Sequence, residues 1–437
     1  MPIRDLLVTL AVFGSLIFII KRPYIGVLVW SWLSYMNPHR LTWGFAYSLP
    51  FAQVVAFALL FSVLINKDSR KGIPINATTI LWIIFIIWMT VTCIFAVYPD
   101  RAFEYYARVI KIQLMTFITI MLMTDQRKID LLIWTIALSI GFFSIKGGIH
   151  SVLNGGIHRT YGPPGTMFGD NNAFALATLM VIPLFYYLYT LPYSKWVKQF
   201  LLAALSLSFI CALCSQSRGA LLAILAVLGY FWWLSKSKVI TAPILILIAV
   251  LGFSFMPESW HERMASIQNF EEDGSAMSRI HAWRYSINIA NDMFTGGGFA
   301  SWSPETYFKY SPDFTGTFVA HSIWFNVLAD HGWLGLALFV SILWITWRNL
   351  SFIIKQTKDE PEKKQIEVLA KMMKLSFVAY FSAGTFLSLS YFDLPWHFVA
   401  ITVILRRIFD EKQMDSKLTP TTERSSSQHS LLRKKPA

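Results

Sequence analysis

Long apolar segments, spaced along almost the whole sequence, limit what this chain can fold into more than any single motif does. Hydrophobic residues make up 55% of the 437 residues, charged residues only 14%, and the mean hydropathy is +0.50. A bilayer core about 30 Å thick needs ~20 mainly apolar residues per helix. The sequence therefore excludes an ordinary soluble protein and predicts an all-α polytopic integral membrane protein. The candidate membrane segments are residues 5–20, 24–36, 51–65, 78–97, 109–123, 129–145, 172–192, 199–214, 219–234, 239–255, 321–347, 372–389 and 394–407.

Basic residues gather in every second loop between these segments. Under the positive-inside rule such loops face the cytoplasm, and the loops between them face outward. We expect about 12 transmembrane helices with both chain ends in the cytoplasm; Pro23 leaves open whether the first two segments form one kinked span or two. The basic clusters are Lys67/Arg70/Lys71, Arg127/Lys128, Lys195/Lys198, Lys236/Lys238 and the run 348–374, and the expected external loops are 98–108, 146–171, 215–218, 256–320 and 390–393.

The same pattern divides the chain into four parts and accounts for its formal charge of +13. Lys and Arg determine topology here, so we expect membrane lipids and no nucleic acid as partners. Residues 355–374 alternate in charge and are expected to form a solvated or interfacial helix. The expected parts are a transmembrane bundle over 1–255, a large, partly helical external loop over 256–320, transmembrane helices over 321–410, and a polar, disordered cytoplasmic tail over 411–437.

The external loop 256–320 is long for a connection between spans, which favours a function for it. It contains Arg279 and Arg284, and His321 follows it where an apolar helix begins. In the first turn of that helix, a histidine would meet the positive end of the helix dipole, which favours the neutral imidazole that a general base needs. An interfacial capping or packing role for His321 is the structural alternative.

Arg218 stands between two apolar segments that only the short sequence SQSRG separates. A guanidinium at this boundary is costly unless an anion meets it, although an arginine that reaches lipid phosphate is the plainer alternative. Because several arginines converge on the external side, we expect Arg218 and Arg279 to bind a lipid diphosphate beside His321. Arg263 and Arg284 are supporting candidates, and Arg284 could instead pair with Asp292 or with the acidic cluster 271–273.

The Gly- and Pro-rich loop 154–172 supplies further candidates. Asp170 precedes a long apolar segment, which predicts an N-cap, while Arg159, Tyr161 and Asp170 together could contact an acceptor sugar. His331, next to Asp330 in the apolar stretch after His321, is either a structural residue or support for the site. No Walker or Rossmann glycine pattern is present and the acidic cluster 271–273 lacks an Asp-x-Asp pattern, so we expect neither cofactor nor metal.

Several stretches together resemble the O-antigen ligase and O-antigen polymerase superfamily. VAHSIWFNVLADHGWLGLALF is similar to the family's histidine signature, and SQSRGA and SRIHAW are similar to its two arginine motifs, in the same order around a large loop. NPHRLTWGFA and GPPGTMFGDNNAFAL resemble the subgroup of exosortase-associated O-glycosylation ligases. The resemblance covers nearly the whole membrane region.

This resemblance implies a GT-C-like, inverting, metal-independent glycosyltransferase in the bacterial inner membrane. It would transfer a glycan from undecaprenyl diphosphate to lipid A core on the periplasmic face, with His321 as base and Arg218 and Arg279 on the donor diphosphate. Ser322 stands where the family more often has Asn, which puts the role of that neighbour in doubt. Three alternatives stay open: an O-antigen polymerase, a protein O-oligosaccharyltransferase, and a flippase for polyprenyl-linked glycans that performs no chemistry.

Overall fold

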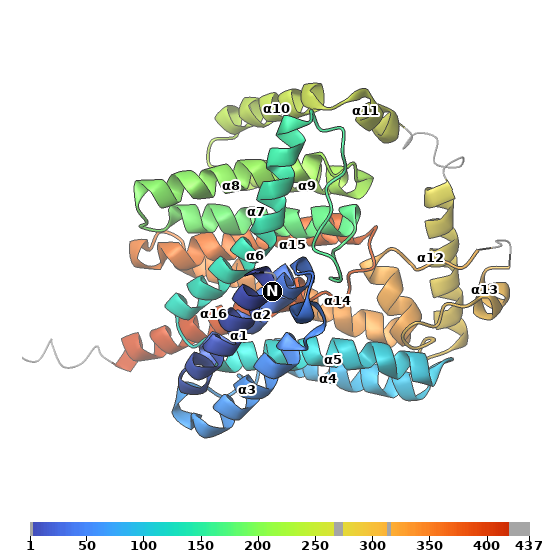
Figure 1. Cartoon of the computed structure of the whole chain (residues 1–437), viewed down its shortest axis with the longest axis horizontal. Coiled ribbons are helices and arrows are strands. Elements are labelled where there is room, and N and C mark those ends of the chain that lie inside the picture. The colour runs from blue at the N-terminus through green and yellow to red at the C-terminus, as the bar shows by residue number, and fades with distance from the viewer. Residues whose placement is uncertain (1–2, 266–273, 313–315, 419–437) are drawn as a thin grey trace, which may run out of the picture.

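The computed structural model describes residues 3–265, 274–312 and 316–418, except the side chains of 259, 263, 275 and 412–418. All regular elements within these ranges are helices, and each expected apolar segment has its own helix (Figure 1). The helices that contain these segments are α1 (Ile3–Lys21), α2 (Pro23–Met36), α3 (Phe51–Ile65), α4 (Ala77–Ile94), α5 (Pro99–Leu122), α6 (Gln126–Leu153), α7 (Asn171–Thr190), α8 (Lys195–Leu213), α9 (Arg218–Leu234), α10 (Lys238–Phe255), α14 (Ile323–Thr357), α15 (Lys364–Gly384) and α16 (Asp393–Leu418).

Eight of the described helices are long and apolar enough to cross a membrane, and α3 and α9 are shorter apolar helices. This finding supports a polytopic membrane protein. The expected number of about 12 spans stays a prediction, because length and composition alone do not decide how the shorter or more polar helices cross the bilayer.

Two connections differ from the expectation drawn from the apolar runs. The predicted external loop 98–108 is wrong, because α5 begins at Pro99 and these residues form its first turns. Proline suits the first position of a helix and Asp100 complements the positive end of its dipole, so the polar start of α5 is still helical. Likewise α6 continues to Leu153, into the predicted loop 146–171.

The charged stretch 355–374 is not one interfacial helix. Its first residues end α14 and its last residues begin α15, with the short 3₁₀ helix η4 (Pro361–Lys363) between them. Pro361 cannot continue a helix and restricts the residue before it, which explains the break. At the other end of the sequence, α16 runs to Leu418, past the expected start of the tail at 411.

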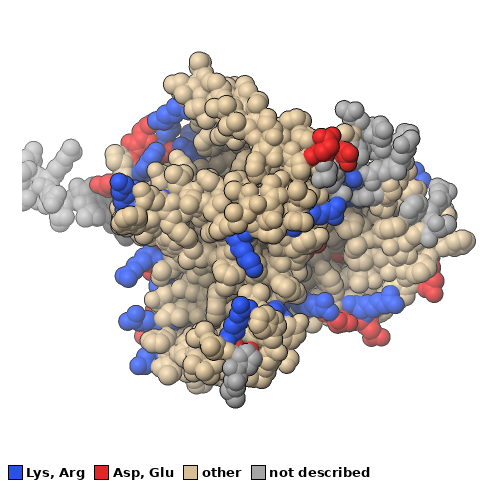
Figure 2. All heavy atoms as spheres, turned by 45° about the horizontal axis from the view of Figure 1, so that its top comes forward, with Lys and Arg blue, Asp and Glu red and all other residues tan. Residues whose placement is uncertain are grey.

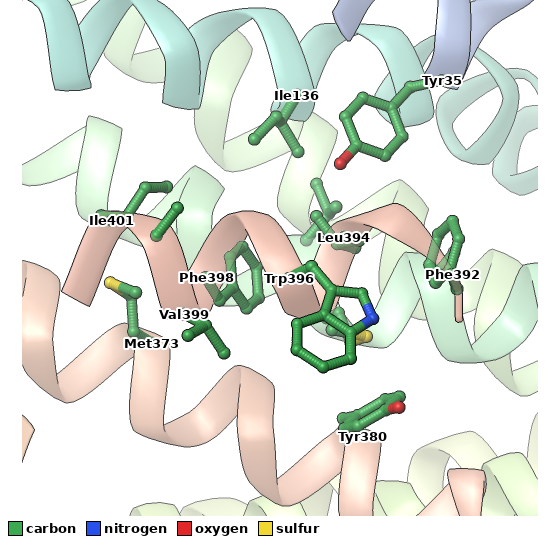
Figure 3. Close-up of a cluster of buried hydrophobic side chains, with 14 of the residues drawn as sticks. Tyr35, Ile136, Met373, Tyr380, Phe392, Leu394, Trp396, Phe398, Val399 and Ile401 are labelled. Carbon is green, nitrogen blue, oxygen red and sulfur yellow. The ribbon is translucent and has the colours of Figure 1, made fainter. Parts of the chain in front are cut away.

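The bundle core lies around α16 and the helices that cover it. Figure 3 shows Trp396 and Phe398 of α16 between Tyr35 of α2 and Tyr380 of α15. The Trp396 indole stacks on that of Trp82, with ring centroids 5.1 Å apart. Burial of such large rings, with the extra energy of ring stacking, fixes how α2, α4, α15 and α16 pack against one another.

The loops with basic clusters meet at one end of the bundle. The Lys71 ammonium lies 2.6 Å from the Glu411 carboxylate, and the Arg407 guanidinium donates to the carbonyl of Met123 at 3.3 Å. The Gln365 amide donates to Asp130, one turn into α6, at 2.8 Å. In Figure 2, Lys and Arg side chains gather along the left edge of the molecule, and others lie in the middle of the face and toward its lower right. Loops that meet at one end in this way are what alternating cytoplasmic loops would produce.

The interval between α10 and α14 contains three further helices. They are α11 (Glu258–Ala265), α12 (Gly274–Asp292) and α13 (Pro304–Tyr310), so the partly helical character expected for 256–320 is confirmed. Figure 1 shows α12 and α13 at the right, beyond the ends of α4 and α5 and on the side away from the free end of α16. We call the end of the bundle where α12 lies the site end.

Candidate functional site

One small cavity at the site end brings together the two arginines that the sequence singles out. Arg218, the first residue of α9, and Arg279 of α12 both line it, although 61 residues separate them in the chain (279 − 218). The cavity has a volume of about 70 Å³. Its other lining residues are Asn172, Ser217, Gly219, Phe386 and Leu387.

Two helix N-termini contribute to this cavity as well. Ser217 caps α9 by accepting a hydrogen bond from the Ala220 amide, and Asp170 caps α7 by accepting from the amides of Asn172 and Ala173 at 2.9 and 3.1 Å. The N-cap predicted at Asp170 is therefore confirmed. The positive ends of two helix dipoles and two guanidinium groups surround one space, and together they favour an anionic ligand.

The turn that carries Arg218 is fixed from both sides. Gln216 has a left-handed backbone with φ 55°, and its side-chain amide donates to the carbonyl of Ile157 at 3.0 Å. The Asn171 amide donates to the carbonyl of Ser215 at 2.8 Å. The Arg159 guanidinium donates to the Gln216 side-chain oxygen at 3.1 Å. Arg159 therefore contacts the residue that precedes Ser217 in the cavity wall.

His321 lies outside α14 rather than in its first turn. The helix begins at Ile323 with Ser322 at the N-cap position, and the His321 backbone is left-handed with φ 42°. A non-glycine residue in this region is strained and persists only where its surroundings hold it. The Trp283 indole of α12 does so by donating to the Ala320 carbonyl at 2.8 Å, while its ring stacks on Phe325 with centroids 4.9 Å apart.

The electrostatic surroundings of His321 link it to the residues of the cavity. Burial lowers the pKa of His321 below its ordinary value, the positive charge of Arg279 lowers it further, and Asp170 opposes the change. The expected direction of the pKa change is therefore right, and burial is its largest cause. A neutral imidazole near neutral pH can accept a proton.

The other predicted residues with described side chains do not line this cavity. Tyr161 is 60% exposed on the same loop as Arg159, and Arg284 is exposed on α12. Asp292, one partner considered for Arg284, contacts the Lys309 ammonium at 2.7 Å. The side chain of Arg263 and the acidic cluster 271–273 lie outside the described residues.

His331 lies in the membrane helix, away from the lining of the cavity. Its ring is completely buried and its Nδ1 is 2.7 Å from the Thr92 hydroxyl of α4. The neighbouring carboxylate of Asp330 accepts from the Tyr391 hydroxyl at 2.9 Å. These contacts give the pair a role in packing α14 against α4 and the segment before α16.

Sequence reasoning missed part of the cavity wall. Phe386 and Leu387 belong to the expected apolar segment 372–389 and follow α15 in the structure, and Asn172 lies beside the predicted N-cap Asp170. Ser217 and Gly219 were signalled only by their position beside Arg218. Among the described residues, no group of three or more His, Cys, Asp or Glu side chains could hold a metal ion.

Two family models match different parts of the chain. Residues 203–340 match the model described as O-antigen ligase, and residues 3–193 match a model described as a family of unknown function. The first match includes Arg218, Arg279 and His321, and it supports the superfamily resemblance seen in the motifs; the subgroup stays a prediction. No curated protein sequence matches the chain.

Proposed function

We propose that this chain is an inverting glycosyltransferase of the O-antigen ligase type, which transfers a glycan from undecaprenyl diphosphate to lipid A core on the periplasmic face of the inner membrane. One observation carries the proposal: Arg218 and Arg279 line one cavity, and Arg279 also acts electrostatically on His321. The match of residues 203–340 to the O-antigen ligase model supports the reaction class.

The donor diphosphate is the ligand that suits this cavity. Arg218 and Arg279 each offer a planar set of N–H donors, a geometry that matches phosphate oxygens better than a lysine ammonium does. The N-termini of α7 and α9 add partial positive charge on the same side. As the bond from the anomeric carbon to the diphosphate breaks, its electron pair moves onto the leaving oxygen, where these groups stabilise the negative charge.

His321 is proposed to act on the acceptor. An acceptor hydroxyl forms the new bond to the anomeric carbon from the face opposite the diphosphate, which inverts the configuration, and its proton passes to the neutral imidazole of His321. General-base assistance of this kind typically contributes ~10²–10⁴-fold to the rate. With His321 protonated and the arginines holding undecaprenyl diphosphate, both charges produced by the step are balanced within the site.

The decisive experiment is transfer by the purified full-length chain. Undecaprenyl-diphosphate-linked glycan is supplied with lipid A core, with free glycan, or with a peptide that carries hydroxyl side chains, and the products are analysed by mass spectrometry. Glycan attached to lipid A core supports the ligase. Product on the glycan or the peptide replaces it with a polymerase or a protein O-oligosaccharyltransferase.

A flippase is separated from these enzymes by His321→Ala. Movement of the intact donor across a vesicle membrane involves no proton abstraction, so a flippase variant would move donor at the normal rate and form no product. If the chain is a glycosyltransferase, we expect this variant to lose glycan transfer while it still binds the donor. Intact donor translocated by the wild-type chain, with no glycan transferred to any acceptor, would overturn the proposal.

A further inference from the structure

A second cavity, far larger than the arginine cavity, runs along α2 and α6. Its volume is about 810 Å³. The α6 residues that line it extend from Thr135 to Ile149, which corresponds to roughly 20 Å of helix at 1.5 Å per residue. Its lining residues are Leu28, Val29, Trp32 and Met36 of α2, Thr135, Leu138, Ser139, Phe142, Ile145, Lys146 and Ile149 of α6, and Phe200 of α8.

Lys146 is the charged residue in this otherwise mainly apolar lining. It lies seven residues before the end of α6 (153 − 146), about 10 Å along the helix from Leu153, and its side chain is exposed. It makes no ion pair with any of the residues that the structure describes, and His150 follows it by one turn on the same helix face. An exposed ammonium group within a membrane helix is costly unless an anion or water meets it.

We call this second cavity the groove. It leads toward the site end of the bundle. Met36, which lines it, is the last residue of α2, and the next residue, Asn37, donates its amide to the Pro164 carbonyl at 2.8 Å. Residue 164 belongs to the loop that connects α6 to α7 and carries Arg159. The charged end of the groove therefore lies toward the polar boundary, and its apolar remainder extends along the membrane part of α6.

We infer that this groove is a binding site for an anionic phospholipid, with one acyl chain lying along α2 and α6 and the phosphate on Lys146. The length of the groove suits one extended hydrocarbon chain, and its single lysine supplies the positive charge that a headgroup with a net negative charge complements. A single basic residue near a membrane surface contributes ~1 kcal/mol to binding of an anionic lipid, which corresponds to about fivefold in affinity. This site is independent of the proposed glycosyl transfer.

Trp32 provides a reporter inside the groove. The full-length chain is reconstituted in phosphatidylcholine vesicles, and a bromine-labelled guest lipid, either phosphatidylglycerol or phosphatidylcholine, is added to quench tryptophan fluorescence. We expect phosphatidylglycerol to quench at about fivefold lower mole fraction than phosphatidylcholine. Trp32→Phe should reduce this difference, because Trp32 is the tryptophan that lines the groove.

Two variants test the phosphate and the chain separately. Lys146→Gln should make the two lipids quench equally, whereas Lys111→Gln, which removes an exposed lysine within α5, should leave the preference intact. Leu138→Phe adds volume at an exposed position of the groove and should weaken quenching by both lipids. Equal quenching by both lipids in the wild type, or equal loss in the Lys111 and Lys146 variants, would overturn the inference.

Discussion

Two histidines ten residues apart, His321 and His331, occupy opposite kinds of surroundings. His321 is half-buried on a strained turn, within the electrostatic influence of Arg279 and Asp170. His331 is completely buried, hydrogen-bonded to Thr92, and enclosed by aromatic rings. Both belong to the same apolar stretch of sequence, so the difference comes from the segments that fold against each of them.

The comparison teaches that charge and access, rather than residue type, separate a candidate base from a structural residue. Around His321, α7 and α12 contribute ionisable groups beside a cavity. Around His331, α4 contributes a hydroxyl, and the ring of Phe299 stands edge-on to the imidazole at 4.6 Å. A general base must reach an acceptor hydroxyl. His321 lies beside charged groups at the site end of the bundle, whereas His331 is enclosed within it.

Replacing each histidine by alanine tests this contrast most strongly. We expect His321→Ala to lower the transfer rate by ~10²–10⁴-fold with little change in thermal stability, because a general base is lost and packing is kept. His331→Ala should instead reduce stability by about 1–3 kcal/mol, because its burial and its bond to Thr92 are lost. Transfer assays and thermal unfolding in detergent measure the two effects. Equal rate loss per folded molecule in both variants would remove the distinction.

Replacement of Arg218 or Arg279, which line the cavity, has the next largest expected effect. Arg218→Gln and Arg279→Gln should each lower the rate by ~10²–10³-fold, because each removes a group that stabilises charge on the leaving diphosphate. Lysine at either position should restore only part of the activity, since it lacks the planar fork. Arg101→Gln is the matched control, because Arg101 is exposed in the first turn of α5 and lies over the Tyr98 ring. A comparable loss in that control would point to general surface charge.

The turn beside His331 requires glycine for a steric reason. Gly332 has φ 67° and ψ −171°, and a Cβ there would lie 2.3 Å from the backbone oxygen of Phe294. Gly332→Ala should therefore cost about 1–3 kcal/mol or more and lower the yield of folded protein. Gly229→Ala is the control, because a Cβ on that α9 residue meets nothing within 4 Å. Unfolding curves that are equally shifted in both variants would show that the turn at Gly332 does not require glycine.

Sequence patterns predicted the helices well because lipid imposes a simple rule on them. An apolar run of sufficient length identifies each span, and basic loops indicate which helix ends lie together. The errors fell where polar sequence is helical, as in the first turns of α5, and where a proline divides a charged helix, as at Pro361. Hydropathy measures contact with lipid, so it gives no signal for polar turns that continue a helix beyond the apolar run.

The candidate site was predictable in part, by residue type and position. Arg218 and His321 each stood out because a charged or titratable group borders an apolar segment, and Arg279 stood out because it lies in the long external loop. Phe386 and Leu387 carried no such signal, because hydrophobic residues at the end of a span look alike whether they face lipid or a cavity. The left-handed turn at His321 and the support from Trp283 depend on contacts between distant segments, which local sequence does not specify.

The smallest predicted effect concerns the pH dependence of transfer. Because burial and Arg279 hold the pKa of His321 below its ordinary value, the neutral base should persist to mildly acidic pH, and transfer should decline only below that range. Asp170 raises this pKa, so Asp170→Asn should lower it further and move the acid limb of the rate profile to lower pH. Asparagine also caps helices well, so α7 should keep its N-terminus.

Arg279→Gln should move the acid limb of the rate profile in the opposite direction from Asp170→Asn. Loss of its positive charge removes an influence that lowers the pKa of His321, so the acid limb should move to higher pH, whatever the decrease in the plateau rate. Steady-state rates across the acid range, normalised to each plateau, measure both displacements. Displacements in the same direction, or none in either variant, would mean that the group whose protonation limits transfer is not the His321 imidazole.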